Sequence, residues 1–224
     1  MNPHFTKADI TLWVTSLTLI LASFLCFDRG SWLTLGASLI GVTSLIFCAK
    51  GNPVGQVLMI AFSILYGIIS YSFAYYGEMI TYLGMTAPMA VVALMSWLAH
   101  PYKGNRAQVS VGKLTGWDYI LVTLLTAAVT VVFYFILDRF NTANLLPSTI
   151  SVATSFAAAY LTFRRSPYFA LAYAANDVVL IVLWILASMT DPSYVSVTVC
   201  FAVFLFNDLY GFLNWRKMGK EQAG

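Results

Sequence analysis

The sequence predicts an all-α, polytopic membrane protein with eight transmembrane helices. Three observations predict this class: 60% of the 224 residues are hydrophobic, only 9% are charged, and the apolar residues gather in long runs. Soluble domains carry about 25% charged residues, so a soluble globular fold is excluded. A helix needs about 20 mostly apolar residues to cross a bilayer, and the runs have this length.

Eight runs qualify as spans. They cover residues 10–27, 32–49, 54–75, 79–98, 118–137, 146–163, 168–190 and 194–215. Because the first run has no small-residue cleavage site and a second run follows at once, we expect a helix there rather than a cleaved signal peptide. Pro88 lies near the middle of the fourth run, and a proline there is expected to kink the helix. The polar, basic segment 100–117 divides the chain into two halves.

The basic residues predict the orientation, because Lys and Arg are retained on the cytoplasmic side of a membrane. With eight spans, only Arg29 and Arg139 fall on one face. The other face receives Lys7, Lys50, Lys103, Arg106, Lys113, Arg164, Arg165, Arg216, Lys217 and Lys220. Both termini are therefore expected in the cytoplasm.

A short motif recurs at two turns between spans. Lys50-x-x-Pro53 and Arg164-x-x-Pro167 lie 114 residues apart, with four spans between them. This spacing indicates two parallel three-helix units joined by the fifth span, a 3+1+3 plan known from small transporters that bind substrate near the midplane. The expected parts are an N-terminal helix (1–31), repeat 1 (32–99), a cytoplasmic loop with connector helix 5 (100–145), repeat 2 (146–217) and a cytoplasmic tail (218–224).

The last two spans each contain an Asn-Asp pair, Asn176-Asp177 and Asn207-Asp208. A carboxylate in the middle of a span costs roughly 3 kcal/mol on insertion, so such a residue usually faces a water-filled cavity or a polar partner. The repeated pair predicts a shared polar site between these helices.

Helical spacing selects the side chains that could line this site. The candidate substrate-binding residues are Gln56, Tyr66, Thr86, Tyr173, Asn176, Asp177, Trp184, Asn207, Asp208, Tyr210 and Asn214. The alternative for the uncharged members is hydrogen bonding between neighbouring helices. For Asn214 and the adjacent Trp215, a place at the membrane interface is a further alternative.

The candidate residues indicate the chemistry of a ligand. Amides and carboxylates suit a sugar such as ribose, and aromatic rings suit a flat heterocycle, best a cationic one. No basic residue lies inside a span, so a phosphorylated ligand would find no countercharge. There is no phosphate-binding Gly-x4-Gly-Lys loop, no metal-ligand cluster and no nucleophile–base pairing. We therefore expect no cofactor, no metal, no nucleic-acid partner and no enzymatic activity.

Three segments resemble the PnuC-type vitamin transporters. They are AANDVVLIVLW (174–184), FNDLYGFLNWRKM (206–218) and GNPVGQVLMIAFSILYGIISYSFAYYGEM (51–79), and the resemblance covers about residues 35–218. It implies a SWEET-like core, a homotrimer in the bacterial inner membrane, and facilitated import of nicotinamide riboside that is trapped by phosphorylation in the cytoplasm. Relatives carry thiamine, riboflavin or deoxynucleosides, so these substrates stay open. The alternative class is a non-transporting sensor or a subunit of a larger complex.

Overall fold

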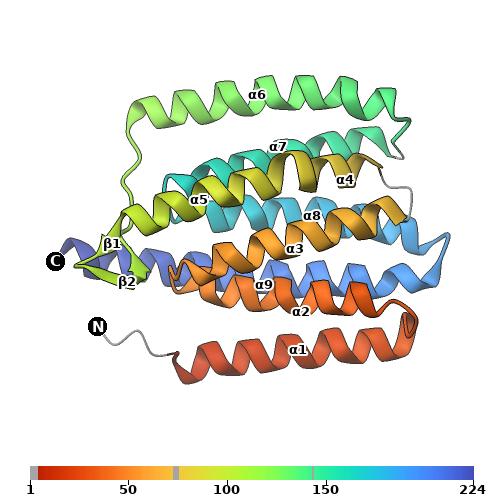
Figure 1. Ribbon diagram of the computed structural model, residues 1–224, viewed down its shortest axis with the longest axis horizontal. Helices are drawn as coiled ribbons and strands as arrows, with labels where there is room; N and C mark the ends of the chain where they lie inside the picture. Colours follow the sequence, from red (N-terminus) through yellow and green to blue (C-terminus); the bar gives the residue numbers. More distant parts are fainter. Residues whose placement is uncertain (1–4, 73–75, 143) are drawn as a thin grey trace.

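Long helices run side by side along one axis in the computed structural model, which describes residues 5–72, 76–142 and 144–224 (Figure 1). Within these ranges, eight helical segments are long and apolar enough to cross a membrane. The predicted fold class and the number of spans are thus confirmed. Residues 73–75, at the end of the third predicted span, lie outside the described residues.

The observed bounds follow the predicted ones closely at most ends. The long helices are α1 (Lys7–Phe27), α2 (Trp32–Ala49), α3 (Val54–Ser72), α6 (Gly116–Arg139), α7 (Leu145–Phe163), α8 (Tyr168–Ser188) and α9 (Val195–Ala223). The fourth span joins α4 (Tyr76–Thr81), the π-helical segment η1 (Tyr82–Thr86) and α5 (Ala87–Ala99). The short elements are β1 (Pro101–Tyr102), β2 (Asn105–Val109) and the 3-10 turn η2 (Pro192–Tyr194).

The predicted distortion at Pro88 takes the form of a π-helical turn just before it. Proline has no N–H to continue the regular ladder, and single π turns are one way in which helices absorb such a break. The N–H of Ala87 bonds instead to the carbonyl of Tyr82, five residues back. The hydroxyl of Thr86 donates to the carbonyl of Thr81 at 3.3 Å. This turn lies in the middle of the bundle, where it orients Tyr82 and Thr86.

The two turns that carry the recurring motif have the same backbone conformation and the same backbone hydrogen bonds. Gly51 and Arg165 both adopt the left-handed conformation, with φ of 65° and 56°. After α2, the N–H groups of residues 51 and 52 bond to the carbonyls of residues 48 and 47. After α7, residues 165 and 166 bond to residues 162 and 161 in the same way. Each set is a Schellman-type helix end, which satisfies carbonyls that would otherwise be unpaired.

The helices α1 and α6, which precede α2 and α7 in the chain, also begin alike. Thr6 caps α1 and Thr115 caps α6, each in a capping box with the acid three residues later. Asp9 forms an ion pair with Lys50 at 2.9 Å, and Asp118 pairs with Arg164 at 2.8 Å. The two helices therefore start with the same cap and the same kind of ion pair. Because the caps extend these helices, each starts two or three residues before its predicted bound.

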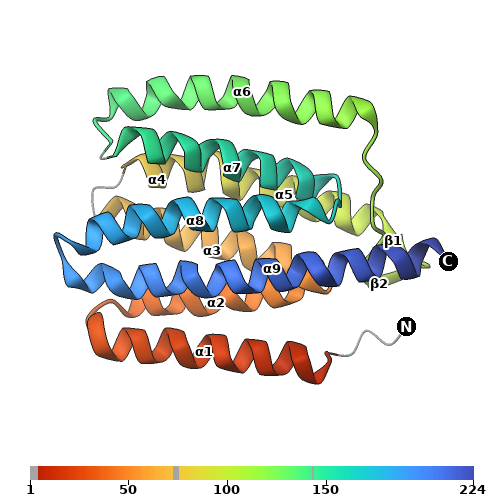
Figure 2. The same ribbon diagram turned by 180° about the vertical axis from the view of Figure 1, so that it is seen from behind.

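The bundle has an edge helix on each side (Figures 1 and 2). At one edge α1 packs on α2 and α9, and at the other edge α6 packs on α7. Only Asp118 and Leu137 of α6 are buried, so most of its apolar surface points outward. A helix that is apolar all round and exposed is suited to a lipid surrounding.

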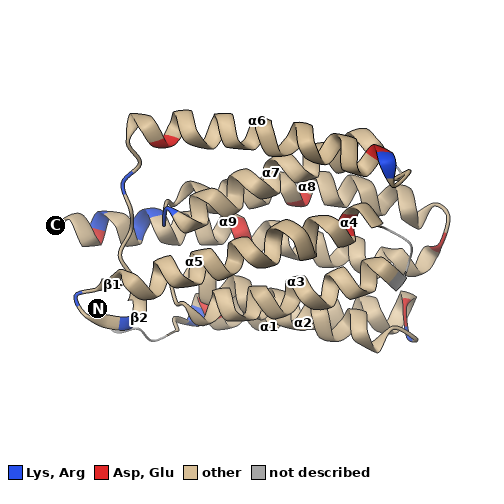
Figure 3. Ribbon diagram, turned by 45° about the horizontal axis from the view of Figure 1, so that its top comes forward, with Lys and Arg blue, Asp and Glu red and all other residues tan. Residues whose placement is uncertain are grey.

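Lys and Arg residues lie at the two ends of the bundle, whereas some Asp and Glu residues lie between the ends (Figure 3). Both chain termini lie at one end, which we call the terminal end (Figures 1 and 2). The ten basic residues that the sequence pattern grouped together lie in elements or connections at this end. At the opposite end, Arg29 follows α1 and Arg139 is the last residue of α6. The predicted separation of charge is present in the fold.

The connecting segment 100–117 holds a small antiparallel hairpin of β1 and β2, which the sequence did not predict. Its turn residues Lys103 and Gly104 both have positive φ, of 48° and 78°, as a tight two-residue hairpin turn requires. Gln222 near the end of α9 accepts a bond from the N–H of Val111 at 2.7 Å and donates to the carbonyl of Val109 at 3.1 Å. The α9 extension beyond the predicted end at 215 thus anchors the hairpin.

Candidate functional site

A small cavity of about 30 Å³ lies in the middle of the bundle, between helices of both halves. It exceeds the roughly 10–15 Å³ that one water molecule needs but is far smaller than the about 300–1,000 Å³ of small-molecule sites, so side chains have to move apart to admit a ligand. We call it the central cavity. It is lined by Leu45, Met59, Phe62, Tyr82, Thr86, Ser155, Tyr173, Asn176, Asp177, Phe201, Phe204 and Asp208. Five of the eleven predicted site residues therefore meet in one hollow: Thr86, Tyr173, Asn176, Asp177 and Asp208.

Two carboxyl groups face each other in the central cavity. Asp177 comes from α8 and Asp208 from α9, and the two side chains are close enough to interact directly. Both residues are about 95% buried, and Asp177 Oδ2 has no hydrogen-bond partner among the described residues. A buried carboxyl oxygen without a partner is unfavourable, so the pair is suited to a guest that brings a positive charge or hydrogen-bond donors.

Asn176 is held by hydroxyl groups of α7. Ser151 Oγ and Thr154 Oγ1 donate to Asn176 Oδ1 at 3.1 and 2.9 Å. These two bonds fix the orientation of the amide beside Asp177. The amide is thus an oriented polar group in the cavity wall, of the kind that gives a small-molecule site its specificity.

Aromatic rings form much of the remaining wall. The ring centroid of Tyr82, in the π turn, lies 6.0 Å from that of Phe62 and 4.4 Å from that of Tyr66. The ring centroids of Phe62 and Phe204 are 5.6 Å apart. Phe201 and Phe204 pack on each other at 5.6 Å. Aromatic faces bind flat rings and attract cations through the negative potential of the ring face. The central cavity thus combines carboxyl groups with aromatic walls.

Three predicted residues of α9 instead tie that helix to its neighbours. Asn207 Nδ2 donates to Ser16 Oγ of α1 at 2.9 Å, and the hydroxyl of Tyr210 donates to Asp9 at 2.6 Å. Asn214 Nδ2 donates to the carbonyl of Ala49 at 3.0 Å. They share one helix face, as the spacing indicated, but that face packs on α1 and α2. The structure does not bring them into the central cavity.

The other three predicted residues also lie outside the central cavity. Gln56 is buried with its amide nitrogen 3.3 Å from the sulfur of Cys48. Tyr66 and Trp184 pack edge to face at 6.3 Å, beyond Tyr82 and towards the opposite end of the bundle. Trp184 lies two turns along α8 from Asp177, so sharing a helix face did not place the two residues in one hollow.

The predicted site did not include Phe201 and Phe204, although a signal existed. Residues 201, 204 and 208 are spaced i, i+3 and i+7, so they share one face of α9 with the cavity carboxyl. Glu78 lies between the third and fourth predicted spans, yet it is buried in the first turn of α4. A carboxylate this close to a span end is as easily placed in solvent as in the bundle, so the sequence did not single it out.

The side chains of the central cavity are poorly suited to binding a metal ion or an anion. Across the described ranges, no three His, Cys, Asp or Glu side chains are placed to hold a metal ion. Its lining includes no Lys or Arg. The arrangement can therefore solvate a neutral or cationic group and offers no countercharge to an anion.

Known proteins share both the sequence pattern and the fold. The PnuC nicotinamide riboside transporter of Neisseria mucosa is 25% identical over 217 residues, which cover 95% of this chain and 82% of that protein. Its counterpart from Haemophilus influenzae is 22% identical over 194 residues, 85% of this chain and 82% of that protein. A crystal structure of the vitamin B3 transporter PnuC superposes with a TM-score of 0.85 at 24% identity, covering 98% of this chain and 94% of that one. The family model described as nicotinamide mononucleotide transporter matches residues 31–217, so the chain belongs to this family of membrane transporters.

Proposed function

We propose that the protein is a facilitative transporter that imports nicotinamide riboside across a bacterial cytoplasmic membrane. The observation that carries the proposal is the pair of carboxyl groups, Asp177 and Asp208, set among aromatic rings in the central cavity. Nicotinamide riboside joins a flat pyridinium cation to a ribose, so its ring suits the aromatic walls and its charge suits the carboxyl pair. The names of the two relatives support the same substrate.

The unphosphorylated riboside fits the cavity better than the mononucleotide in the family name. A phosphate buried there would need a cationic partner, and the cavity lining supplies none. Phosphorylation after entry would therefore convert the substrate into a product that the same site rejects. This is the physical basis for trapping the vitamin in the cytoplasm without an ion gradient.

We also propose that the terminal end faces the cytoplasm, because ten of the twelve basic residues gather there. The proposed repeats comprise α2–α5 and α7–α9, with α1 and α6 as counterparts that precede them. The family resemblance supports a homotrimer, which the mass of the solubilised particle would test. Orientation can be tested with Cys26, an exposed cysteine near the opposite end of α1. A membrane-impermeant thiol reagent should label it from outside intact cells.

Uptake into proteoliposomes tests the transport proposal. Purified protein should equilibrate labelled nicotinamide riboside across the membrane, and accumulate it only when a riboside kinase and ATP are enclosed. An excess of unlabelled nicotinamide mononucleotide should compete poorly. Competition by thiamine, riboflavin or a deoxynucleoside instead of the riboside would reassign the substrate. Accumulation without the kinase would contradict the facilitative mechanism, and the absence of uptake of every compound would contradict transport.

A further inference from the structure

A second pocket, of about 40 Å³, opens at the end of the bundle opposite to the termini, between α4, the α6–α7 connection, α7 and α8. We infer that this outer pocket is a separate binding station for the cationic ring of the substrate, with the carboxylate of Glu78 as its countercharge. The inference rests on the proposed function, and it goes beyond it by assigning a first site on the import route.

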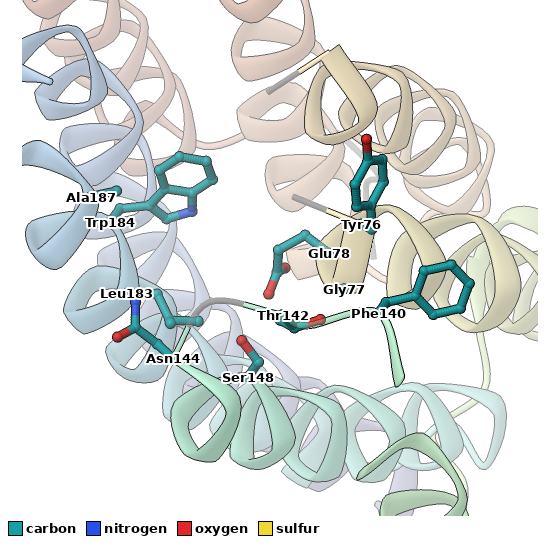
Figure 4. A pocket seen from close by; sticks show the side chains of 10 residues that line it. All are labelled: Tyr76, Gly77, Glu78, Phe140, Thr142, Asn144, Ser148, Leu183, Trp184 and Ala187. Carbon is teal, nitrogen blue, oxygen red and sulfur yellow. The ribbon is translucent and has the colours of Figure 1, made fainter. Parts of the chain in front are cut away.

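Glu78 is the main reason for this assignment. Glu78 is only 7% exposed, and its side chain points into the pocket (Figure 4). Among residues 5–72, 76–142 and 144–224, Glu78 Oε2 has no hydrogen-bond partner and Glu78 forms no ion pair. Burying a carboxylate without a partner is costly, so the site is expected to recruit a cation.

The floor of the outer pocket is polar and closely built. Thr142 Oγ1 is buried and also lacks a partner within the described part of the chain. The close approach of this residue to α4 depends on Gly77, because a Cβ there would lie 2.6 Å from Thr142 Cγ2. Ser148 of α7 adds a second hydroxyl to the lining near Glu78 (Figure 4). Hydroxyl groups beside a carboxylate suit the ribose that accompanies the cationic ring.

Trp184 supplies an aromatic surface across the pocket from Glu78 (Figure 4). Tryptophan is the strongest of the aromatic side chains in attracting a cation to its face. A pyridinium ring between Trp184 and Glu78 would gain ring contact from one and charge pairing from the other. This combination favours an organic ring cation over a bare metal ion, for which the described residues hold no cluster of ligands.

Packed aromatic rings separate the outer pocket from the central cavity. Trp184 contacts Tyr66 at 6.3 Å, and Tyr66 contacts Tyr82, which lines the central cavity, at 4.4 Å. Tyr66 also packs on Phe201 at 5.7 Å. A substrate held at Glu78 would therefore have to displace this barrier before it reached Asp177. The two carboxylate sites would act in sequence, one on each side of the barrier.

Substitution of Glu78 can be tested with two substrates of nearly equal shape. Nicotinamide riboside is cationic, whereas its reduced dihydro form is neutral. The wild-type protein should take up the cation with the lower KM. Glu78→Gln keeps the size of the side chain. It should reduce the ratio between the KM of the neutral form and the KM of the cation about tenfold or more, as expected for a lost charged interaction. Asp138→Asn, which removes an exposed carboxylate near the same end, should leave the preference unchanged.

Two more variants and a change of the cation in the buffer distinguish a failure of the outer pocket from a failure of the transport proposal. Glu78→Asp retains the charge and should restore much of the preference. Thr142→Lys should place an ammonium next to Glu78 and mimic Glu78→Gln, which also covers the case in which the latter does not fold. If the wild type carries the riboside and both variants keep its full preference for the cation, the outer station is wrong while the transport proposal stands. If the effect of Glu78→Gln vanishes when N-methylglucamine replaces sodium, the pocket holds a metal ion and the inference is overturned.

Discussion

The indole rings of Trp97 and Trp215 pack on each other with their centroids 5.3 Å apart, and each ring bonds to the opposite half of the protein. Trp97 Nε1 donates to the carbonyl of Thr162 in α7 at 2.9 Å, and Trp215 Nε1 donates to the carbonyl of Cys48 in α2 at 2.8 Å. Both tryptophans are fully buried. The fourth span of each half is thereby fastened to the second span of the other half, on the terminal side of the central cavity.

Replacing either tryptophan by phenylalanine should destabilise the protein by a similar amount. The ring contact is kept, but a carbonyl that also accepts a backbone N–H loses the second of its donors, which costs about 0.5–1.5 kcal/mol for a typical hydrogen bond. Thermal unfolding in detergent would measure the change for Trp97→Phe, Trp215→Phe and the double variant. Because the two rings touch, the effects should not add. Strict additivity would show that the two contacts are independent. Trp117, which is exposed on α6, provides the control Trp117→Phe.

Because α1 and α6 have the same cap and ion pair, removing the negative charge of either capping acid should lower the stability of the protein in a similar way. Asp9→Asn and Asp118→Asn each remove an ion pair with the base that follows α2 or α7. Both should lower the free energy of unfolding, by about 1–3 kcal/mol for a lost charged hydrogen bond. The Asp9 variant should lose more, because the hydroxyl of Tyr210 donates to Asp9 at 2.6 Å, whereas the hydroxyl of Tyr160 is 3.5 Å from Asp118. A thermal shift for Asp118→Asn alone would contradict the equivalence of the two helices.

Substituting a polar residue of α8 should weaken substrate binding, whereas substituting a polar residue of α9 should lower the stability of the protein. Asp177→Asn retains the size of a cavity side chain but removes a carboxylate, so affinity for nicotinamide riboside should fall about tenfold or more. Asn207→Ala removes the bond to Ser16 of α1, so it should lower the melting temperature and leave affinity nearly unchanged. Calorimetric titration and thermal unfolding of both variants would test this. The reverse pattern would place the substrate near α1.

The contact between Gln222 and the hairpin predicts a local effect on the connecting segment. Gln222→Ala removes two bonds to the backbone of residues 109 and 111. The segment should then open more often, because locally unfolded states become cheaper when few contacts hold a loop. Trypsin cleavage after Lys103, Arg106 or Lys113 should be faster than in the wild type. Glu221→Ala, at the neighbouring exposed position, serves as the control, and equal cleavage rates would contradict the anchoring role.

The central cavity shows how far helical spacing can be taken. The repeated Asn-Asp pairs predicted a polar site between α8 and α9, and both carboxyl groups line one cavity there with Asn176. Spacing also grouped Asn207 with Tyr210 and Asn214, which do share a face. The structure packs that face against α1 and α2, and spacing alone does not say which neighbour a face meets. Trp215, for which an interfacial position was an alternative, is instead buried at the centre of the terminal end.

The sequence by itself determined the class of protein, the eight spans and the separation of charge between the two ends. These properties follow from composition and length, because each helix in lipid satisfies its own backbone hydrogen bonds and is recognisable without its neighbours. Only the tertiary structure decided that Asp177 and Asp208 share a hollow, that Glu78 lies in a second one, and that Asn207 faces α1. Those outcomes depend on how each helix is rotated against its partners, and rotation is set by packing between segments far apart in the chain.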